Sequence, residues 1–287
     1  MSIKSINPSD LAIPQLHQFL LGSVGPRPIC FASTIDENGV SNLAPFSFFN
    51  VFSANPPILV FSPARSGRTG ASKNTYDNCK VVPEVVVNMV NYNMVQQMSL
   101  ASSPYPKGVD EFVKAGFTPV ASELIKPFRV KESPVQLECK VIEIKELGQG
   151  GGAGNLIICE IVKLHIDESI ITENNHIDPR KIDLVARMGG NFYCRANGES
   201  LFEIPKPITS IGIGVDQLPE HIKYSSELTG NHLGQLGQLE AIPMEDEYQK
   251  AETMSADDAF HTAKALLQDN KTFEALCVLL KNTYNEQ

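Results

Sequence analysis

Short apolar runs separated by turn-forming residues dominate the chain between residues 27 and 167. The clearest is 135–141, where apolar and polar residues alternate with the period of a half-buried strand. The turn Asp36-Glu37-Asn38-Gly39 separates the first two runs, and the glycine-rich stretch 148–154 joins the last two into a long hairpin. We predict strands at 27–35, 40–51, 58–61, 84–90, 135–141 and 156–165.

Helical segments are short and lie between these strands. We predict them at 71–80, 92–101 and 109–115. Because strands dominate and no regular helix separates them, the pattern favours a mainly β fold, a barrel with helical insertions. A parallel α/β sheet is the alternative, and it would require helices between successive strands.

The pattern changes after residue 205, so we divide the chain into a domain at 1–205 and a partly helical C-terminal extension at 206–287. The Ile-Gly-Ile-Gly of 211–214 indicates a connecting stretch, and Ser255 followed by two aspartates is typical of a helix start. Two apolar stripes follow at helical spacing: Phe260, Ala263 and Leu267, then Phe273, Leu276, Cys277 and Leu280. We predict a helical hairpin over 255–283, with both stripes buried against the barrel or a second subunit.

Negative charge is concentrated in the extension. Residues 1–200 carry 18 Lys or Arg and 19 Asp or Glu, whereas residues 201–287 carry six and 14. No segment is strongly basic, which argues against nucleic acid as a partner. The apolar runs are too short to span a bilayer and the N-terminus has no signal-peptide pattern, so we expect a cytoplasmic protein with no membrane partner.

Motifs of common hydrolases and metal sites are missing from the sequence. It contains no Gly-x-Ser-x-Gly, His-Glu-x-x-His or Cys-x-x-Cys pattern, so we predict neither a nucleophile elbow nor a metal site. The six scattered cysteines are expected to be reduced and mostly buried. The glycines of 148–154 lead into a strand-like run and not a helix, which favours a turn over a dinucleotide-binding loop.

One polar strand pair, residues 33–49, mixes hydroxyls, amides and aromatic rings. Asn42, Ala44 and Pro45 carry little side-chain bulk, so a flat ring system could approach the backbone there. An ordinary hairpin with an exposed polar face is the alternative interpretation.

A second stretch, residues 62–75, concentrates positive charge in a part of the chain that is otherwise neutral. Its cations are Arg65, Arg68 and Lys73, and serine and threonine hydroxyls lie between them. The stretch is predicted to end at a helix N-terminus, where free N–H groups favour an anion. A phosphate site and a solvated basic loop both remain open interpretations.

Taken in order, several short segments resemble the flavin reductase-like family, whose fold is the FMN-binding split barrel. The resemblance covers about residues 23–200. The matching segments are 25–29 (Gly-Pro-Arg-Pro-Ile), Ser33-Thr34, 42–50, Pro56-Pro57, 73–75 (Lys-Asn-Thr), 103–112, 132–134 and 186–190 (Ala-Arg-Met-Gly-Gly).

The resemblance implies a homodimer with FMN between its subunits and NAD(P)H as a transient co-substrate whose hydride passes to flavin N5. It implies that Ser33, Thr34, Asn42, Ala44, Pro45 and Ser47 line the ring and ribityl chain, and that Ser62, Arg65, Lys73 and Thr75 face the phosphate. Such a protein needs no acid, base or nucleophile of its own. It implies an electron-accepting protein or a monooxygenase as partner. The alternatives are a non-catalytic, flavoredoxin-like FMN electron carrier and a binding module without turnover.

Overall fold

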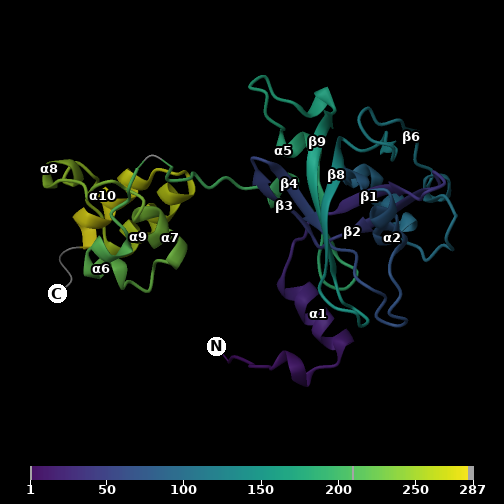
Figure 1. Ribbon diagram of the computed structural model, residues 1–287. Helices are drawn as coiled ribbons and strands as arrows, with labels where there is room; N and C mark the ends of the chain where they lie inside the picture. The colour runs from purple at the N-terminus through teal and green to yellow at the C-terminus, as the bar shows by residue number, and fades with distance from the viewer. Residues whose placement is uncertain (1, 209, 284–287) are drawn as a thin grey trace. The chain divides into compact units, whose positions relative to one another are not determined.

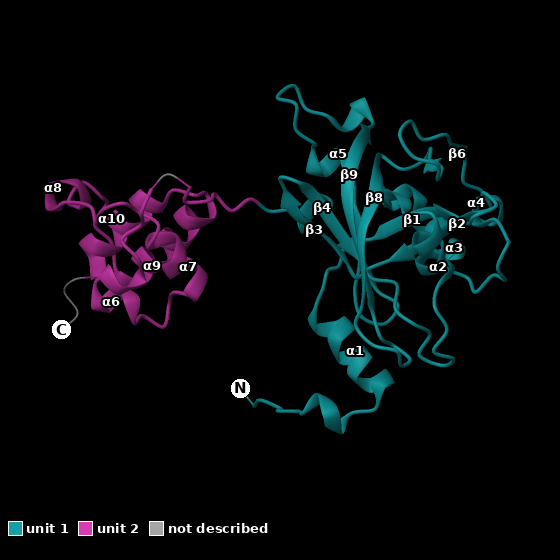
Figure 2. Ribbon diagram, in the orientation of Figure 1, with its two compact units in different colours: residues 1–202 teal, residues 203–287 magenta. Residues whose placement is uncertain are grey.

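The structure is a computed structural model that describes residues 2–208 and 210–283. The chain forms two compact units, residues 1–202 and residues 203–287 (Figure 2). Each is described by itself below. The sequence-based division after residue 205, as a statement about independent domains, stays a prediction.

Unit 1 is built on one seven-stranded sheet (Figure 1). Its strands are β1 (Cys30–Ile35), β2 (Ser41–Phe46), β3 (Phe49–Ala54), β4 (Pro57–Phe61), β5 (Glu84–Met89), β8 (Val135–Glu146) and β9 (Asn155–Ile166). Their order in the sheet is β2-β1-β5-β8-β9-β4-β3, and all six neighbouring pairs are antiparallel. This confirms the mainly β fold and excludes the parallel alternative.

The two edge strands of this sheet, β2 and β3, are joined by only two residues, Ser47 and Phe48. So short a connection brings the two edges together, and the sheet therefore curls into a split barrel. The single strand predicted over 40–51 is wrong, because β2 ends at Phe46, opposite Cys30 at the start of β1. Pro26 and Pro28 lie just before Cys30 and have no N–H to donate. The hydrogen-bond ladder between β1 and β2 therefore cannot continue beyond Phe46.

The inside of the barrel is an apolar cluster that includes four cysteine thiols. Cys30, Cys79, Cys139 and Cys159 lie in it beside large side chains such as Phe61. Burial raises the pKa of all four thiols, that of Cys79 to about 12, so they stay protonated. All six cysteines of the chain are free, and Cys194 alone is not buried.

Short helices and two small hairpins decorate the barrel. The helices are α1 (Ile13–Ser23), α2 (Asn74–Val81), α3 (Val95–Ala101), α4 (Glu111–Ala115) and α5 (Pro179–Ile182). The hairpins pair β6 (Pro119–Val120) with β7 (Arg129–Val130) and β10 (Val185–Arg187) with β11 (Tyr193–Arg195). Helix α2 begins three residues later than predicted, since Lys73 still has extended backbone angles. Helix α1 was not predicted at all.

Unit 2 consists of helices. They are α6 (Glu220–Lys223), α7 (Gly230–Leu236), α8 (Glu245–Tyr248), α9 (Ala256–Gln268) and α10 (Thr272–Thr283). Helices α9 and α10 form the predicted hairpin, but their stripes pack on Ile222 and Leu236 of the same unit. Phe273 was assigned to the second stripe and is 41% exposed, because the buried face of α10 begins at Ala275. Among the described residues, no helix has the length and apolar character to cross a membrane.

Candidate functional site

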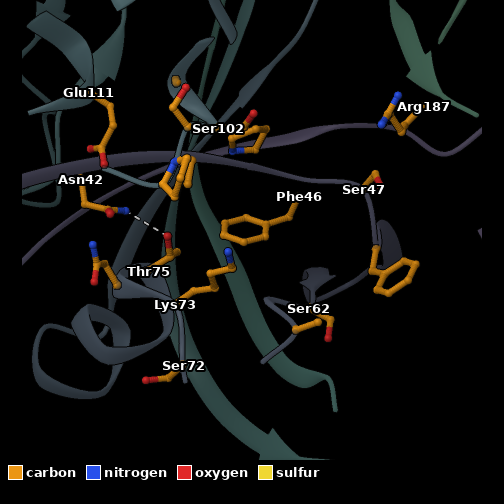
Figure 3. Close-up of a pocket in the computed structure, with 18 of the residues that line it drawn as sticks. Asn42, Phe46, Ser47, Ser62, Ser72, Lys73, Thr75, Ser102, Glu111 and Arg187 are labelled. Carbon is orange, nitrogen blue, oxygen red and sulfur yellow. Dashed lines mark hydrogen bonds between the residues drawn. The ribbon is translucent and has the colours of Figure 1, made fainter. Parts of the chain in front are cut away.

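A cavity of unit 1 with a volume of about 490 Å³ opens beside the edge strand β2 (Figure 3). It is lined by residues from α1, from β2 and its link to β3, from the start of α2 and from the end of α3, together with Arg187 of β10. The polar and charged residues that line it are His17, Arg27, Asn42, Ser47, Ser62, Ser72, Lys73, Asn74, Thr75, Ser102, Ser103, Tyr105, Glu111 and Arg187.

Seven of the ten residues proposed from the sequence line this cavity, although they come from two stretches of the chain. They are Asn42, Ala44, Pro45, Ser47, Ser62, Lys73 and Thr75. The structure brings the two stretches together because β2 and the start of α2 both lie beside β1. Ser33, Thr34 and Arg65 do not line the cavity.

Thr34 lies beneath the cavity and organises two of its lining residues. Its Oγ1 accepts hydrogen bonds from Nδ2 of Asn42, at 3.3 Å, and from Nδ2 of Asn78, at 3.1 Å. Asn42 Nδ2 also donates to Thr75 Oγ1, at 2.9 Å. This buried network ties β1, β2 and α2 together. Ser33 points to the opposite face of β1, since successive side chains of a strand alternate, and its buried hydroxyl has no partner among the described residues.

Arg65 is turned away from the cavity by the loop between β8 and β9. Its Nη2 lies 3.4 Å from Oε1 of Gln149 and 3.8 Å from Oε2 of Glu146, and its Nη1 lies 3.4 Å from the carbonyl oxygen of Gly70. Glu146 therefore offsets the charge of Arg65. Of the three cations in the basic stretch, only Lys73 lines the cavity.

The side of the cavity formed by α2 presents unused donors. The first helical N–H to donate is that of Tyr76, so the N–H groups of Asn74 and Thr75 lie ahead of the first helical hydrogen bond. Lys73 is exposed and has no ion-pair partner among the residues that the structure describes. An ammonium group, two free N–H groups and the buried hydroxyls of Ser62 and Thr75 together suit an anion.

Two arginines line the opposite side of the cavity, and sequence reasoning assigned neither a role. Arg27 is 5% exposed and donates to the carbonyl oxygens of Leu21, at 2.6 Å, and of Met188, at 3.0 Å. Burial and the nearby Arg187 both lower the pKa of Arg27. A signal did exist, since both arginines lie in segments that match the family, but neither lies in a cluster of charge.

Glu111, a third residue that sequence reasoning missed, brings the one carboxyl group into the described lining of the cavity. Its Oε2 accepts a hydrogen bond from the N–H of Leu43, at 3.0 Å, and thereby covers the free edge of β2. Burial raises the pKa of this carboxyl. The cavity thus holds Lys73 and two arginines against one acid, which favours a negatively charged ligand. The described residues contain no cluster of three or more His, Cys, Asp or Glu that could hold a metal ion.

Comparison with known proteins places this site in a family. The sequence model of the flavin reductase like domain matches residues 22–180, more than half of the chain. The chain belongs to the flavin reductase-like family. The split barrel described above is the fold of this family, so the resemblance drawn from the sequence is confirmed.

Two solved structures and one further protein are similar to this chain. Component B of nitrilotriacetate monooxygenase from Bacillus cereus is 30% identical, with a TM-score of 0.66 over 71% of this chain and 100% of its own. The 2-nitrobenzoate 2-nitroreductase NbaA of Pseudomonas fluorescens is 28% identical, with a TM-score of 0.63 over 73% and 100%. An uncharacterized protein of Aquifex aeolicus is 35% identical over 66% of this chain and 94% of its own. Since both solved chains are covered in full, more than a quarter of this chain has no counterpart in them.

Proposed function

We propose that this protein binds FMN in the cavity of unit 1 and acts as a flavin reductase that takes a hydride from NAD(P)H. The observation that carries the proposal is the excess of positive charge around a cavity of about 490 Å³, in a member of the flavin reductase-like family. Ligand sites of this kind usually have volumes of about 300–1,000 Å³.

The residues present fit the cofactor. Ala44 and Pro45 leave a low wall along β2 against which a flat ring can lie, and Asn42 and Ser47 offer polar groups at its two ends. Lys73, with Ser62 and Thr75, would hold the phosphate at the start of α2. Thr34 does not line the cavity and would act indirectly. Its Oγ1 accepts a hydrogen bond from the amide of Asn42, and that amide also donates to the hydroxyl of Thr75.

When bound, FMN supplies the N5 position that accepts a hydride from the reduced nicotinamide. The protein's own side chains then have to bind, orient and exclude water, and no proton needs to move through them. Glu111 is consistent with a site in which no side chain transfers a proton. Burial favours the neutral form of its carboxyl group, and a hydrogen bond from the backbone holds that group in place.

A non-catalytic electron carrier is the second candidate, and turnover distinguishes it from a reductase. The measurement is oxidation of NADH and of NADPH by the purified protein, with and without added FMN. A reductase should oxidise at least one of them, with a rate that saturates in FMN. A protein that binds FMN but oxidises neither would be a carrier, and one that binds no FMN would contradict both.

The Bacillus cereus relative is a monooxygenase component, and from it we infer a monooxygenase, or another electron-accepting protein, as the partner of this chain. We also propose a homodimer, with the cofactor site shared between subunits. Sedimentation should give about twice the chain mass of 31.4 kDa. A monomer at micromolar concentration that still binds FMN would exclude the shared site.

A further inference from the structure

The arginine side of the cavity is a positive centre without a counter-charge. Arg27 and Arg187 are backbone partners, with N–H to carbonyl hydrogen bonds of 3.0 and 2.8 Å in the two directions. Both side chains line the cavity, and among the described residues neither guanidinium meets a carboxylate. Figure 3 shows Arg187 on the Ser47 side of the cavity, away from Lys73 and Thr75.

The two guanidinium groups have different amounts of hydrogen-bonding capacity left. Each carries five N–H donors. Arg27 uses four, toward Ser47 Oγ and the carbonyl oxygens of Leu21, Val24 and Met188. Arg187 uses one, toward the carbonyl oxygen of Phe192 at 3.3 Å. Arg27 is therefore a fixed charge, and Arg187 has donors left for a ligand.

Arg187 also connects the cavity to a second one. Its Cζ lies 4.5 Å from the ring centre of Tyr193, its register partner across the β10–β11 hairpin. Tyr193 in turn lines a neighbouring cavity of about 200 Å³, together with Tyr92, Val185 and Arg195. In that cavity the Cζ of Arg195 lies 3.9 Å from the ring centre of Tyr92.

One face of the β10–β11 hairpin thus carries Arg187, Arg195 and the ring of Tyr193, and the ring of Tyr92, from outside the hairpin, lies next to Arg195. Val185 and Arg187 are two residues apart on one strand, as are Tyr193 and Arg195 on the other, and the pairs face each other in register. Residues two apart lie on the same face, separated by about 6.6–6.8 Å. A nucleotide has the same two kinds of group, since its phosphates are joined through one ribose to a flat base.

We propose that this hairpin face binds the adenosine diphosphate half of the reduced nicotinamide dinucleotide. The pyrophosphate lies on Arg187, with the fixed charge of Arg27 behind it, and the adenine enters the cavity of Tyr92 and Tyr193. The inference rests on the proposed function, since it names residues that recognise the hydride donor. It leaves the FMN phosphate to Lys73 and the start of α2.

The test separates the parts of the dinucleotide by using truncated probes on the FMN-loaded protein. ADP-ribose has the adenosine and both phosphates but no nicotinamide, so its binding is measured by calorimetry without turnover. NADH is compared in kinetics with reduced nicotinamide mononucleotide, which lacks the adenosine, and with reduced nicotinamide riboside, which lacks every phosphate. The variants are Arg187→Gln, Tyr193→Leu and Tyr193→Phe. Arg180→Gln, an exposed arginine outside both cavities, is the control.

Arg187→Gln should raise the Kd of ADP-ribose and the KM of NADH by about tenfold or more, because charge-assisted hydrogen bonds are lost. Its KM for the riboside should rise much less than its KM for NADH, because the riboside has no phosphate. Tyr193→Leu should weaken ADP-ribose and NADH but not the mononucleotide, and Tyr193→Phe should behave like the wild type. Arg180→Gln should change none of these values.

Other outcomes would overturn the inference. If Arg187→Gln weakens FMN binding and leaves ADP-ribose unaffected, the guanidinium serves the cofactor. If it raises the KM of the riboside as much as that of NADH, it shapes the cavity and binds no phosphate. A wild type that oxidises NADH but does not bind ADP-ribose would refute the hairpin site and leave the reductase intact. Binding of ADP-ribose that depends on Arg187, without NADH oxidation, would refute the reductase alone.

Discussion

Replacing Lys73 by alanine tests the cofactor site at its phosphate end. The side chain is exposed and has no ion pair or side-chain hydrogen bond among the described residues, so its removal breaks no polar interaction of the folded protein. An ammonium group 4 Å from an anion gains about 1 kcal/mol in water and about 4 kcal/mol near a protein surface. The exposure of Lys73 favours the lower part of this range. A loss of about 1–2 kcal/mol corresponds to FMN binding that is about five- to thirtyfold weaker.

Fluorescence quenching on titration with FMN and with riboflavin measures this loss. Riboflavin lacks the phosphate, so it should bind the wild type and Lys73→Ala equally. Lys80→Ala is a matched control, since Lys80 lies at the other end of α2, outside the cavity and 4.0 Å from Glu146. Because the contact is exposed to solvent, the difference between wild type and variant should shrink as ionic strength rises.

Two results would refute this reasoning. Equal losses for FMN and riboflavin would mean that Lys73 orders the loop before α2 and does not contact the phosphate. An unchanged Kd for both flavins would place the phosphate elsewhere, and Arg68 would then be the next cation to replace.

Three further predictions concern stability and organisation. Burial raises the pKa of Glu111 above its usual value of 4.5, so its contribution to stability is lost as pH rises through the folded pKa. Glu111→Gln should abolish this loss in thermal melts at increasing pH, and an unchanged pH profile would contradict it. Thr34→Val should lower the free energy of unfolding by about 1–3 kcal/mol in urea, because two buried amides lose an acceptor, and a neutral result would refute the network. Deleting residues 203–287 should leave FMN binding unchanged, and a folded fragment without flavin would show that unit 2 completes the site.

Most strands of the barrel could be predicted because alternation is a local signal. The error over 40–51 is not local, since β2 ends where the prolines before β1 leave it without a partner. Helix α1 was missed although Ile13, Leu16 and Leu20 recur at helical spacing, and none of its residues is buried. The stripes of α9 and α10 were visible, but their packing partners lie in α6 and α7, whose short helices carry a weaker pattern.

The residues of the candidate site could likewise be predicted only where the signal is local in the sequence. Asn42, Lys73 and Thr75 were found because each lies in a short stretch with a distinctive composition. Arg65 lies in such a stretch too, but Glu146, which draws it away, is far along the chain. Arg187 enters the cavity from a distant hairpin, and although its segment matches the family, no cluster of charge around it indicates that it joins the others.

The distribution of thiols makes the chain a convenient substrate for labelling. Alkylating reagents react with thiolates, and burial keeps five of the six cysteines protonated and out of reach. Cys194 is the exception, and it lines the cavity of Tyr92 and Tyr193. A maleimide dye should therefore attach at one position of the unmodified protein. There the dye would give an optical reporter for the β10–β11 hairpin without an engineered cysteine.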